Sequence, residues 1–427
     1  MVKEILPIKA SEASVTIPGS KSYTHRALVV ASLAHGESVI ENPLFCDDTR
    51  YTATALEKLG AELDQSSARI TVRGVNGIPN ACPDTLQFGN SGTSIRFLTA
   101  ISALGSGTYT LSGSARMSER PIQDLLDSLV QLGVRAYSIQ GNGCPPLCIE
   151  TRGVKGGDVS LKANVSSQYL SALLMIGPCT ANGLDIRLKS DLVSQPYVTM
   201  TQEVMARFGA SVEYKKHGDS GDQGRFIVQG GIGYRPGKVV IEPDASNASY
   251  FWGAAAISGS RIKVLGIDRR SGQGDIGVLE LLAQMGCKVI HESDGIVVEG
   301  GALRGITVDM GMMPDMVPTV SVVAAFAQGK TVIRNVAHLK VKETDRLAAV
   351  KNELTSMGIN VELLSDGLVI EGGKPHGAII ETYDDHRIAM AFAIAGLVVP
   401  GVRIKNPACV EKSFSGFWDT LEKLSEK

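Results

Sequence analysis

The chain has 427 residues, of which 44% are hydrophobic and 20% are charged, a composition typical of soluble globular proteins with two or three domains. Its formal net charge of −2 excludes a bulk attraction to nucleic acid or to an anionic membrane, so an anionic ligand must meet cations that the fold brings together locally. The longest apolar run, residues 388–399, is shorter than the roughly 20 residues that cross a bilayer, and MVKEILPIKA at the start lacks the apolar core of a signal peptide.

The cysteines indicate a reducing compartment. Their number, seven, is odd and their spacing is irregular, which argues against a disulfide framework. Cys144 and Cys148 have no second pair and no histidine nearby, so we expect no zinc site. We therefore expect a cytoplasmic protein.

A glycine followed by a short alternating apolar run recurs six times along the chain. The segments are GESVIENP at Gly36, GTYTLSGS at Gly107, GLDIRLKS at Gly183, GSRIKVLG at Gly259, GKTVIRNV at Gly329 and GVRIKNPA at Gly401. By subtraction, successive glycines are 71, 76, 76, 70 and 72 residues apart. The alternation predicts half-buried strands, and the glycine suits the end of the small-residue helix that precedes each strand.

A second glycine series follows the first and marks the end of a second helix. It comprises LEKLG at Gly60, LVQLG at Gly133, MARFG at Gly209, LAQMG at Gly286 and LTSMG at Gly358, and the sixth copy is LEKLS near the end of the sequence. A strand and a hairpin follow each of the first five. The sequence therefore predicts an α/β protein of six related units, each with helix, strand, helix, strand and strand.

The helix that precedes each marker glycine begins in a segment rich in Gly, Ser, Asn and Asp, the residues that cap helices. Counting back from the glycines places these starts at Lys21, Gly92, Ser167, Asp244, Asp315 and His386. Helix N-termini are natural phosphate sites. For Asp244, Ser246 and Asn247 we prefer ordinary capping. Cations that oppose the helix dipole instead indicate an anion to hold, and they are Lys21, Arg26, Arg96 and Arg387.

The loop before each second helix also collects polar residues, namely Arg120, Ser194, Lys342 and Lys412. KVKETDR, residues 340–346, lies here and leads into a predicted helix. That helix carries four apolar residues on one face, Leu347, Val350, Leu354 and Met357. Because Lys342 and Arg346 sit at its N-terminus and oppose the dipole, we favour a charge-handling site over a solvated helix end.

Seven motifs together resemble those of the 5-enolpyruvylshikimate-3-phosphate synthase family in order and approximate spacing. They are PGSKSYTHRAL, GNSGTSIRFLTA, RMSERPIQDLLDSL, VSSQYLSALLM, DASNASYF, VKETDRLA and TYDDHRIAMAFA, and the likeness that they mark extends over nearly the whole chain. The resemblance implies the enolpyruvyl transferase fold, with two globular domains of three βαβαββ repeats each and the site in the cleft between them. It implies that residues 21–240 form the shikimate 3-phosphate-binding domain, and that residues 1–20 join 241–427 in the second.

The resemblance implies transfer of the enolpyruvyl group of phosphoenolpyruvate to the 5-hydroxyl of shikimate 3-phosphate, with release of phosphate. It implies no metal and no organic cofactor. We expect small-molecule substrates only, with no nucleic acid and no membrane, and a monomer. Two anionic substrates repel one another, so fixed cations in a water-poor site must offset that repulsion.

The resemblance also implies the residues that hold each substrate. Those implied for phosphoenolpyruvate are Lys21, Gly92, Arg120, Gln168, Arg346, His386, Arg387 and Lys412. Those implied for shikimate 3-phosphate are Lys21, Ser22, Arg26, Ser166, Ser167, Gln168, Ser194, Tyr197, Asp315, His338 and Lys342. Arg96 is added as a structural or long-range cation.

Three residues are implied for proton transfer, which the reaction needs in both directions. Asp315 is implied as the base near the 5-hydroxyl. Glu343 is implied to exchange the methyl proton, with Lys21 as its acid–base partner.

The chain departs from the family pattern at two positions and leaves two other readings open. His338 stands where many relatives have Asn, and Phe97 where many have Pro. Gly92 predicts sensitivity to glyphosate, which competes with phosphoenolpyruvate in the family, although Phe97 and Ser91 bear on its degree. A sister family transfers enolpyruvyl to UDP-N-acetylglucosamine and usually has a catalytic Cys where this chain has Ala115. A non-catalytic repeat protein that binds nucleic acid would want a basic face and aromatic residues.

Overall fold

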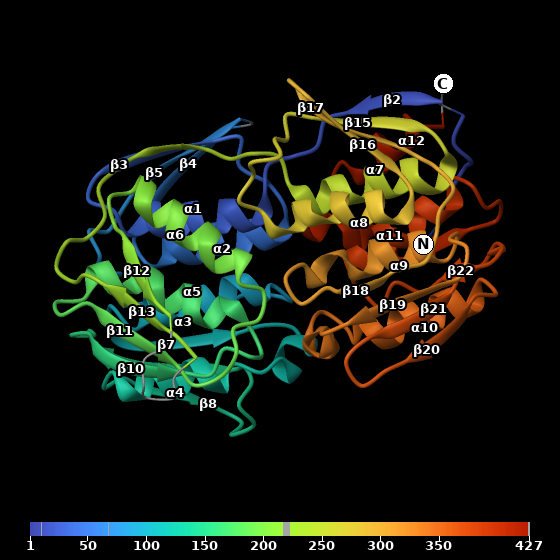
Figure 1. Cartoon of the computed structure of the whole chain (residues 1–427). Coiled ribbons are helices and arrows are strands. Elements are labelled where there is room, and N and C mark those ends of the chain that lie inside the picture. The colour runs from blue at the N-terminus through green and yellow to red at the C-terminus, as the bar shows by residue number, and fades with distance from the viewer. Residues whose placement is uncertain (10, 67, 217–222, 426–427) are drawn as a thin grey trace. The chain divides into compact units, whose positions relative to one another are not determined.

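A computed structural model, which describes residues 1–9, 11–66, 68–216 and 223–425, divides the chain into two units that are each continuous in space. We call Gly19–Ile241 the middle unit, and Met1–Pro18 together with Glu242–Lys427 the terminal unit. The chain therefore starts in the terminal unit, leaves it after Pro18 and returns after Ile241 (Figure 1).

The described residues form six small sheets, three in each unit, which confirms the prediction of six related α/β units. Five of them have four strands in one order, with a parallel pair followed by an antiparallel hairpin. In the middle unit they are β14 (Lys238–Val240), β3 (Glu37–Glu41), β5 (Arg69–Arg73) and β4 (Glu62–Ser66); β6 (Leu86–Gln87), β7 (Ser106–Ser112), β9 (Leu147–Arg152) and β8 (Arg135–Ser138); and β10 (Gly157–Leu161), β11 (Leu184–Leu188), β13 (Arg225–Val228) and β12 (Val212–Lys215).

The terminal unit repeats the pattern, except in its last sheet. Its sheets are β16 (Lys288–Glu292), β17 (Gly295–Glu299), β15 (Arg261–Leu265) and β2 (Glu12–Val15); β18 (Thr307–Asp309), β19 (Lys330–Arg334), β21 (Leu368–Glu371) and β20 (Asn360–Leu363); and β1 (Val2–Glu4), β23 (Arg403–Lys405) and β22 (Ile379–Ile380). The sixth repeat ends without a hairpin, and β1 pairs antiparallel with β23 in its place.

Two strands pair in a different unit from the helix that follows them in sequence. β2 precedes the first helix of the middle unit in sequence, yet it pairs in parallel with β15 of the terminal unit. β14 precedes the first helix of the returning segment, yet it pairs with β3 of the middle unit. Each unit thus completes one of its sheets with the strand that lies just before the chain leaves that unit.

The marker glycines owe their recurrence to backbone conformation. The six in the first series have φ between +72° and +138°, and the five in the second have φ between +82° and +113°. L-residues with a Cβ rarely adopt this region, and glycine does so without steric cost. The glycine series therefore records the same turn at the same place in successive repeats.

The first helix of each repeat is buried on nearly all sides in its unit, including most of the polar residues at its start. These helices are α1 (Lys21–Leu33), α3 (Gly92–Ser102), α5 (Ser167–Ile176), α7 (Ala245–Ser258), α9 (Val317–Ala324) and α11 (His386–Gly396). Five begin within one residue of the predicted start, and Asp315 lies in the 3-10 turn Pro314–Met316 directly before α9.

The second helices each have a buried face and an exposed face. They are α2 (Asp47–Lys58), α4 (Gln123–Gln131), α6 (Pro196–Arg207), α8 (Val278–Met285), α10 (Arg346–Ser356) and α12 (Phe417–Glu422). The apolar face predicted for α10 is confirmed, because each of its four residues is 1% exposed or less.

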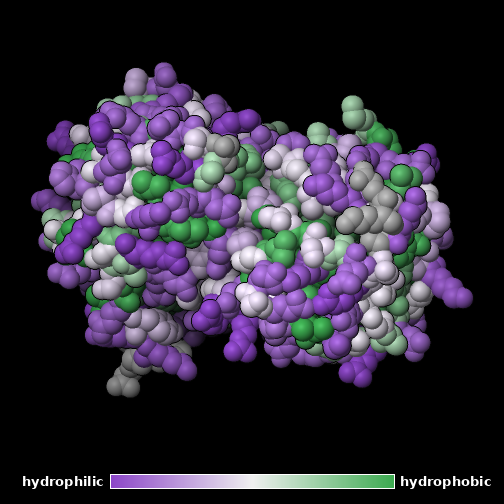
Figure 2. Space-filling view, turned by 90° about the horizontal axis from the view of Figure 1, so that it is seen from above, coloured by the Kyte–Doolittle hydropathy of each residue, from purple (hydrophilic) through white to green (hydrophobic). Residues whose placement is uncertain are grey.

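Hydrophilic side chains predominate on the face shown in Figure 2, and hydrophobic ones appear there in smaller groups. Within the described part of the chain, none of the helices has both the length and the apolar character that crossing a bilayer requires.

Candidate active site

A buried guanidinium surrounded by three carboxylates lies at the start of α10 in the terminal unit. The side chain of Arg346 is 2% exposed. It donates to Asp385 from Nε at 2.7 Å and from Nη2 at 3.3 Å, to Asp315 from Nη1 at 2.9 Å and to Glu343 from Nη2 at 2.9 Å. Burial lowers the pKa of Arg346, but these three carboxylates outweigh burial and raise it, so the group is a permanent cation.

Asp315 joins two of the predicted cations. Its Oδ1 accepts from Arg346, and its Oδ2 accepts from Nη2 of Arg387 at 2.7 Å. Burial raises the pKa of Asp315, but the positive charges of Arg387, Lys342 and Arg346 outweigh burial and hold the pKa well below its usual range. Without an anionic ligand beside those cations, this carboxylate is a weak base.

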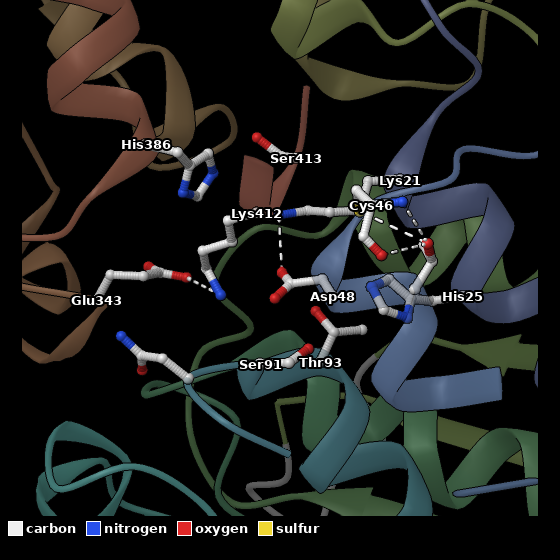
Figure 3. A network of polar contacts seen from close by, with 12 residues as sticks. Lys21, His25, Cys46, Asp48, Ser91, Thr93, Glu343, His386, Lys412 and Ser413 are labelled. Atoms are coloured by element: carbon white, nitrogen blue, oxygen red, sulfur yellow. Dashed lines mark hydrogen bonds and ion pairs between the residues drawn. The ribbon is translucent and has the colours of Figure 1, made fainter. Parts of the chain in front are cut away.

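Glu343 lies between a guanidinium and an ammonium. Its Oε2 accepts from Arg346, and its Oε1 is 3.9 Å from Nζ of Lys412 (Figure 3). Its side chain is 10% exposed and that of Lys412 is 11% exposed. A nearly buried carboxylate beside the ammonium group of a lysine is suited to proton exchange.

Local sequence places these groups. Asp345 caps α10, because its side chain accepts from the backbone N–H of Ala348 at 3.1 Å. Asp385 caps α11 by accepting from the backbone N–H of Arg387 at 2.9 Å, and His386, 1% exposed, begins that helix. Within KVKETDR, Asp345 therefore caps the helix, whereas Glu343 and Arg346 belong to the buried cluster of charges.

His338 lies in the 3-10 turn Ala337–Val341 before these charges. Burial, and next the positive charge of Lys342, lower its pKa to about 4. The ring is therefore neutral at pH 7, with one nitrogen that donates and one that accepts, whereas an Asn side chain has two N–H donors and an acceptor oxygen. A neutral His338 can thus donate one hydrogen bond and accept one.

Lys21 is the first residue of α1 in the middle unit and is paired with a carboxylate that the sequence did not indicate. Its Nζ donates to Oδ2 of Asp48 at 3.1 Å (Figure 3). The two side chains are 13% and 4% exposed. Asp48 lies in the first turn of α2, where the helix dipole favours an anion.

Gly92 and Arg120 meet at the start of α3. A Cβ added to Gly92 would lie 2.5 Å from Nη2 of Arg120. Nη1 of Arg120 donates to the backbone oxygen of Asn90 at 2.9 Å and to its Oδ1 at 3.0 Å. The absence of a side chain at Gly92 thus makes room for the guanidinium.

Gln168 and Arg96 form a hydrogen-bonded pair. Nη1 of Arg96 donates to Oε1 of Gln168 at 2.7 Å, and Nε2 of Gln168 donates to Oγ1 of Thr93 at 2.8 Å. Arg96 also lies over the ring of Tyr169, 5.3 Å from its centroid. Arg96 therefore orients Gln168, a role that the sequence described only as structural or long-range.

Arg26 is 1% exposed and ties α1 to α6. It donates to Oγ1 of Thr201 at 2.7 Å and to the backbone oxygens of Ser22 and Tyr197, each at 2.9 Å. Burial lowers its pKa to about 10, so it remains charged at pH 7. Phe97 lies beneath it, 5.3 Å from ring centroid to guanidinium carbon, which gives this departure from the family a cation–π role.

The serines predicted for substrate lie at element ends. Ser166 caps α5 by accepting from the backbone N–H of Gln168 at 3.3 Å, and Ser167 begins that helix. Ser194 precedes α6 with a φ of +53°, and its backbone oxygen accepts from the N–H of Tyr197 at 3.1 Å. A non-glycine residue held at positive φ is a strained position of the kind found at functional sites.

Two groups of predicted residues thus come together, one in each unit. The terminal unit gathers Arg346, Asp315, Arg387, Glu343 and Lys412. The middle unit gathers Gly92 with Arg120, and Arg26 with Ser22 and Tyr197. The sequence did not single out Asp48, Asn90 or Asp385, although Asp385 stands inside the quoted motif TYDDHR.

Comparisons with known proteins agree on one family. The family model for EPSP synthase (3-phosphoshikimate 1-carboxyvinyltransferase) matches residues 5–421. A 3-phosphoshikimate 1-carboxyvinyltransferase of Syntrophobacter fumaroxidans is 43% identical over 99% of this chain and 100% of its own length. That of Trichormus variabilis is 44% identical over 97% of this chain and 96% of its own. The solved EPSP synthase from Acinetobacter baumannii has a TM-score of 0.80 and 26% identity, covering 99% of this chain and 98% of that one.

Proposed function

The chain belongs to the EPSP synthase (3-phosphoshikimate 1-carboxyvinyltransferase) family, and we propose that it transfers the enolpyruvyl group of phosphoenolpyruvate to the 5-hydroxyl of shikimate 3-phosphate. The products are 5-enolpyruvylshikimate 3-phosphate and phosphate. The single observation that carries the proposal is the family match over nearly the whole chain. The buried cations of both units, which suit anionic substrates, support it.

Phosphoenolpyruvate carries a phosphate and a carboxylate, and guanidinium groups bind both in two-pronged fashion. In the terminal unit we propose Arg346, Arg387, His386 and Lys412 as its ligands. In the middle unit we propose Lys21, Arg120 and Gln168, with Gly92 leaving the guanidinium of Arg120 in place. Arg346 already donates four hydrogen bonds to carboxylates, so its contribution to binding is mainly its charge and one further N–H.

We propose that shikimate 3-phosphate is held mainly by residues of the middle unit. Hydroxyl groups and cations at helix N-termini suit its phosphate. The proposed residues are Lys21, Ser22, Arg26, Ser166, Ser167, Gln168, Ser194 and Tyr197, with Asp315, His338 and Lys342 contributed by the terminal unit. His338 would take part as a neutral ring.

In the proposed addition step, the 5-oxygen forms a bond to C2 of phosphoenolpyruvate, its proton passes to Asp315, and C3 gains a proton from the acid–base pair of Glu343 and Lys21. Asp315 is a weak base because the positive charges of Arg387, Lys342 and Arg346 hold its pKa well below its usual range. Bound phosphates and carboxylate would screen those cations and raise its proton affinity. Substrate binding itself would therefore activate the base.

In the proposed elimination step, the bond between C2 and the phosphate oxygen breaks, and a proton leaves the methyl group at C3. Glu343 is our candidate for moving that proton, because its carboxylate is nearly buried and lies 3.9 Å from the ammonium of Lys412. Lys21 is our candidate acid–base partner. No metal or organic cofactor is needed for either step, and we propose a cytoplasmic monomer.

The two other readings are less well supported. The UDP-N-acetylglucosamine transferases usually have a catalytic Cys five residues before an Arg-Pro pair, where this chain has Ala115 before Arg120 and Pro121. A nucleic-acid-binding repeat protein is disfavoured by the net charge of −2 and by the 5% aromatic content.

The test is phosphate release from phosphoenolpyruvate with each substrate omitted in turn. We expect release only when both shikimate 3-phosphate and phosphoenolpyruvate are present. Release without shikimate 3-phosphate, or none with both, would overturn the proposal.

A further inference from the structure

A chain of buried side-chain hydrogen bonds crosses the middle unit beside the proposed ligands of phosphoenolpyruvate. Nδ1 of His25 lies 2.8 Å from Oγ1 of Thr52, which lies 2.8 Å from Oγ of Ser94. Ser94 in turn lies 2.6 Å from Oγ of Ser91 and 3.1 Å from the backbone oxygen of Asp48. His25, Thr52, Ser94 and Ser91 are each 0% exposed, and we call these four residues the hydroxyl chain.

The backbone oxygen of Asp48 sets the direction of every proton in the hydroxyl chain. A carbonyl can only accept, so Ser94 uses its single proton on Asp48 and must accept from both Thr52 and Ser91. Thr52 then has no proton left for His25. His25 must therefore donate, which requires a proton on its Nδ1.

The hydroxyl chain ends at two groups proposed to hold the same substrate. The backbone oxygen of Asp48 accepts from Ser94. The carboxylate of Asp48 accepts from the ammonium of Lys21, as Figure 3 shows, so Asp48 links the hydroxyl chain to Lys21. At the other end, Ser91 directly precedes Gly92 and follows Asn90, which holds Arg120. The hydroxyl chain thus connects α1, α2 and α3, with Lys21 near one end and the contact between Gly92 and Arg120 near the other.

These helices also pack with buried hydroxyl groups that make no hydrogen bond to the described residues, so the hydrogen bonds of the hydroxyl chain are not explained by helix packing alone. α1 and α3 also contain Ser32 and Ser102, which are 1% and 0% exposed, and their hydroxyls find no hydrogen-bond partner in the described part of the chain. Those serines lie toward the far ends of the helices, whereas the connected hydroxyls cluster at the ends that carry Lys21 and Gly92. The connected arrangement therefore coincides with the proposed substrate groups.

We infer that the hydroxyl chain is a set of positioning residues that fixes the ammonium of Lys21 relative to Gly92 and Arg120, and so sets the affinity for phosphoenolpyruvate. The inference rests on the proposed function. Small errors in the separation of groups that bind one ligand weaken binding steeply, and a misplacement of about 1 Å can cost up to about 100-fold. Removal of Ser94 should therefore act on phosphoenolpyruvate more than on shikimate 3-phosphate.

The test compares Ser94→Ala with Ser102→Ala, which removes an unconnected buried hydroxyl from the same helix. We expect Ser94→Ala to raise the KM for phosphoenolpyruvate about tenfold and the KM for shikimate 3-phosphate by a smaller factor, because Lys21 is a proposed ligand of both substrates whereas Gly92 and Arg120 are proposed for phosphoenolpyruvate alone. Ser102→Ala should change neither. Thr52→Val, which keeps side-chain shape, should act like Ser94→Ala, and the double variant should be no worse than the more affected single one because both break the same chain.

Variants of His25 test whether the hydrogen bond from Nδ1, and not packing alone, controls the KM for phosphoenolpyruvate. His25→Asn keeps a donor near the position of Nδ1 and should retain wild-type KM for phosphoenolpyruvate, whereas His25→Leu should raise it. Nitrogen NMR of the wild-type protein should find Nδ1 of His25 protonated.

The outcomes separate this inference from the proposed function. A wild-type protein that releases no phosphate with both substrates would defeat the proposed function. An active wild type, with Ser94→Ala and Thr52→Val folded and indistinguishable from Ser102→Ala in their KM for phosphoenolpyruvate, would overturn the inference. If Ser94→Ala fails to fold, Thr52→Val and the His25 pair decide by the same criterion.

Discussion

Adding one methyl group at Gly92 should weaken phosphoenolpyruvate binding without harming the fold. The Cβ of Gly92→Ala would lie 2.5 Å from Nη2 and 2.8 Å from Cζ of Arg120. Restoring an ordinary contact of 3.4 Å to Nη2 requires a shift of about 0.9 Å. The obstructing atoms are the far end of a flexible side chain, so the guanidinium moves and the backbone does not.

That displacement breaks the geometry of the two hydrogen bonds from Arg120 to Asn90. A misplacement of about 1 Å in a group that positions a substrate costs up to about 100-fold, so we expect the KM for phosphoenolpyruvate to rise about 10- to 100-fold. The KM for shikimate 3-phosphate and the midpoint of thermal unfolding should change little.

The assay is phosphate release at saturating shikimate 3-phosphate with varied phosphoenolpyruvate. Gly237→Ala is the matched control, because its nearest atom, the backbone oxygen of Arg207, would lie at 3.4 Å and its φ is not in the left-handed region. A folded Gly92→Ala protein with a KM for phosphoenolpyruvate within twofold of wild type would show that the position of Arg120 does not control phosphoenolpyruvate binding.

Three further predictions follow from the terminal unit. Glu343→Gln should fold normally and lose about 10²- to 10⁴-fold in kcat, because an amide accepts from Arg346 but cannot carry the proton; a near wild-type kcat would exclude the assigned role. The pKa of His338 falls from 6.5 to about 4 on folding, so its contribution to stability is present above pH 6.5 and is lost as the pH falls toward 4; urea unfolding of His338→Asn should show a smaller loss over that range, and parallel losses would contradict the pKa shift. Asp385→Ala should lower the free energy of unfolding by about 3–5 kcal/mol, because it leaves the buried guanidinium of Arg346 without its principal partner, and a loss below about 1 kcal/mol by urea titration would show that the cluster compensates.

The repeat and the helix starts could be predicted because their causes are local. A glycine is required where the backbone takes a positive φ, and it recurs wherever the turn recurs. Asp244 caps α7 through the backbone N–H of Asn247, as its sequence context predicted. The strand exchange could not be predicted in this way. Residues 12–15 and 238–240 resemble other short strands, and only long-range packing decides that they pair with β15 and β3.

The partners of the charged residues could not be predicted because they come from distant segments. Arg346 is held by Asp385, 39 residues away in sequence, a partner that the sequence did not indicate. Lys21 is paired with Asp48, 27 residues away. The resemblance identified the cations as a group, and the structure adds the carboxylates that hold them in position before any ligand binds.

The most direct measurement follows both substrates and both products by phosphorus NMR, with shikimate 3-phosphate and UDP-N-acetylglucosamine offered together. We expect phosphoenolpyruvate and shikimate 3-phosphate to disappear in equal amounts while inorganic phosphate and the enolpyruvyl product appear. Loss of UDP-N-acetylglucosamine, or phosphate formed without consumption of shikimate 3-phosphate, would contradict it.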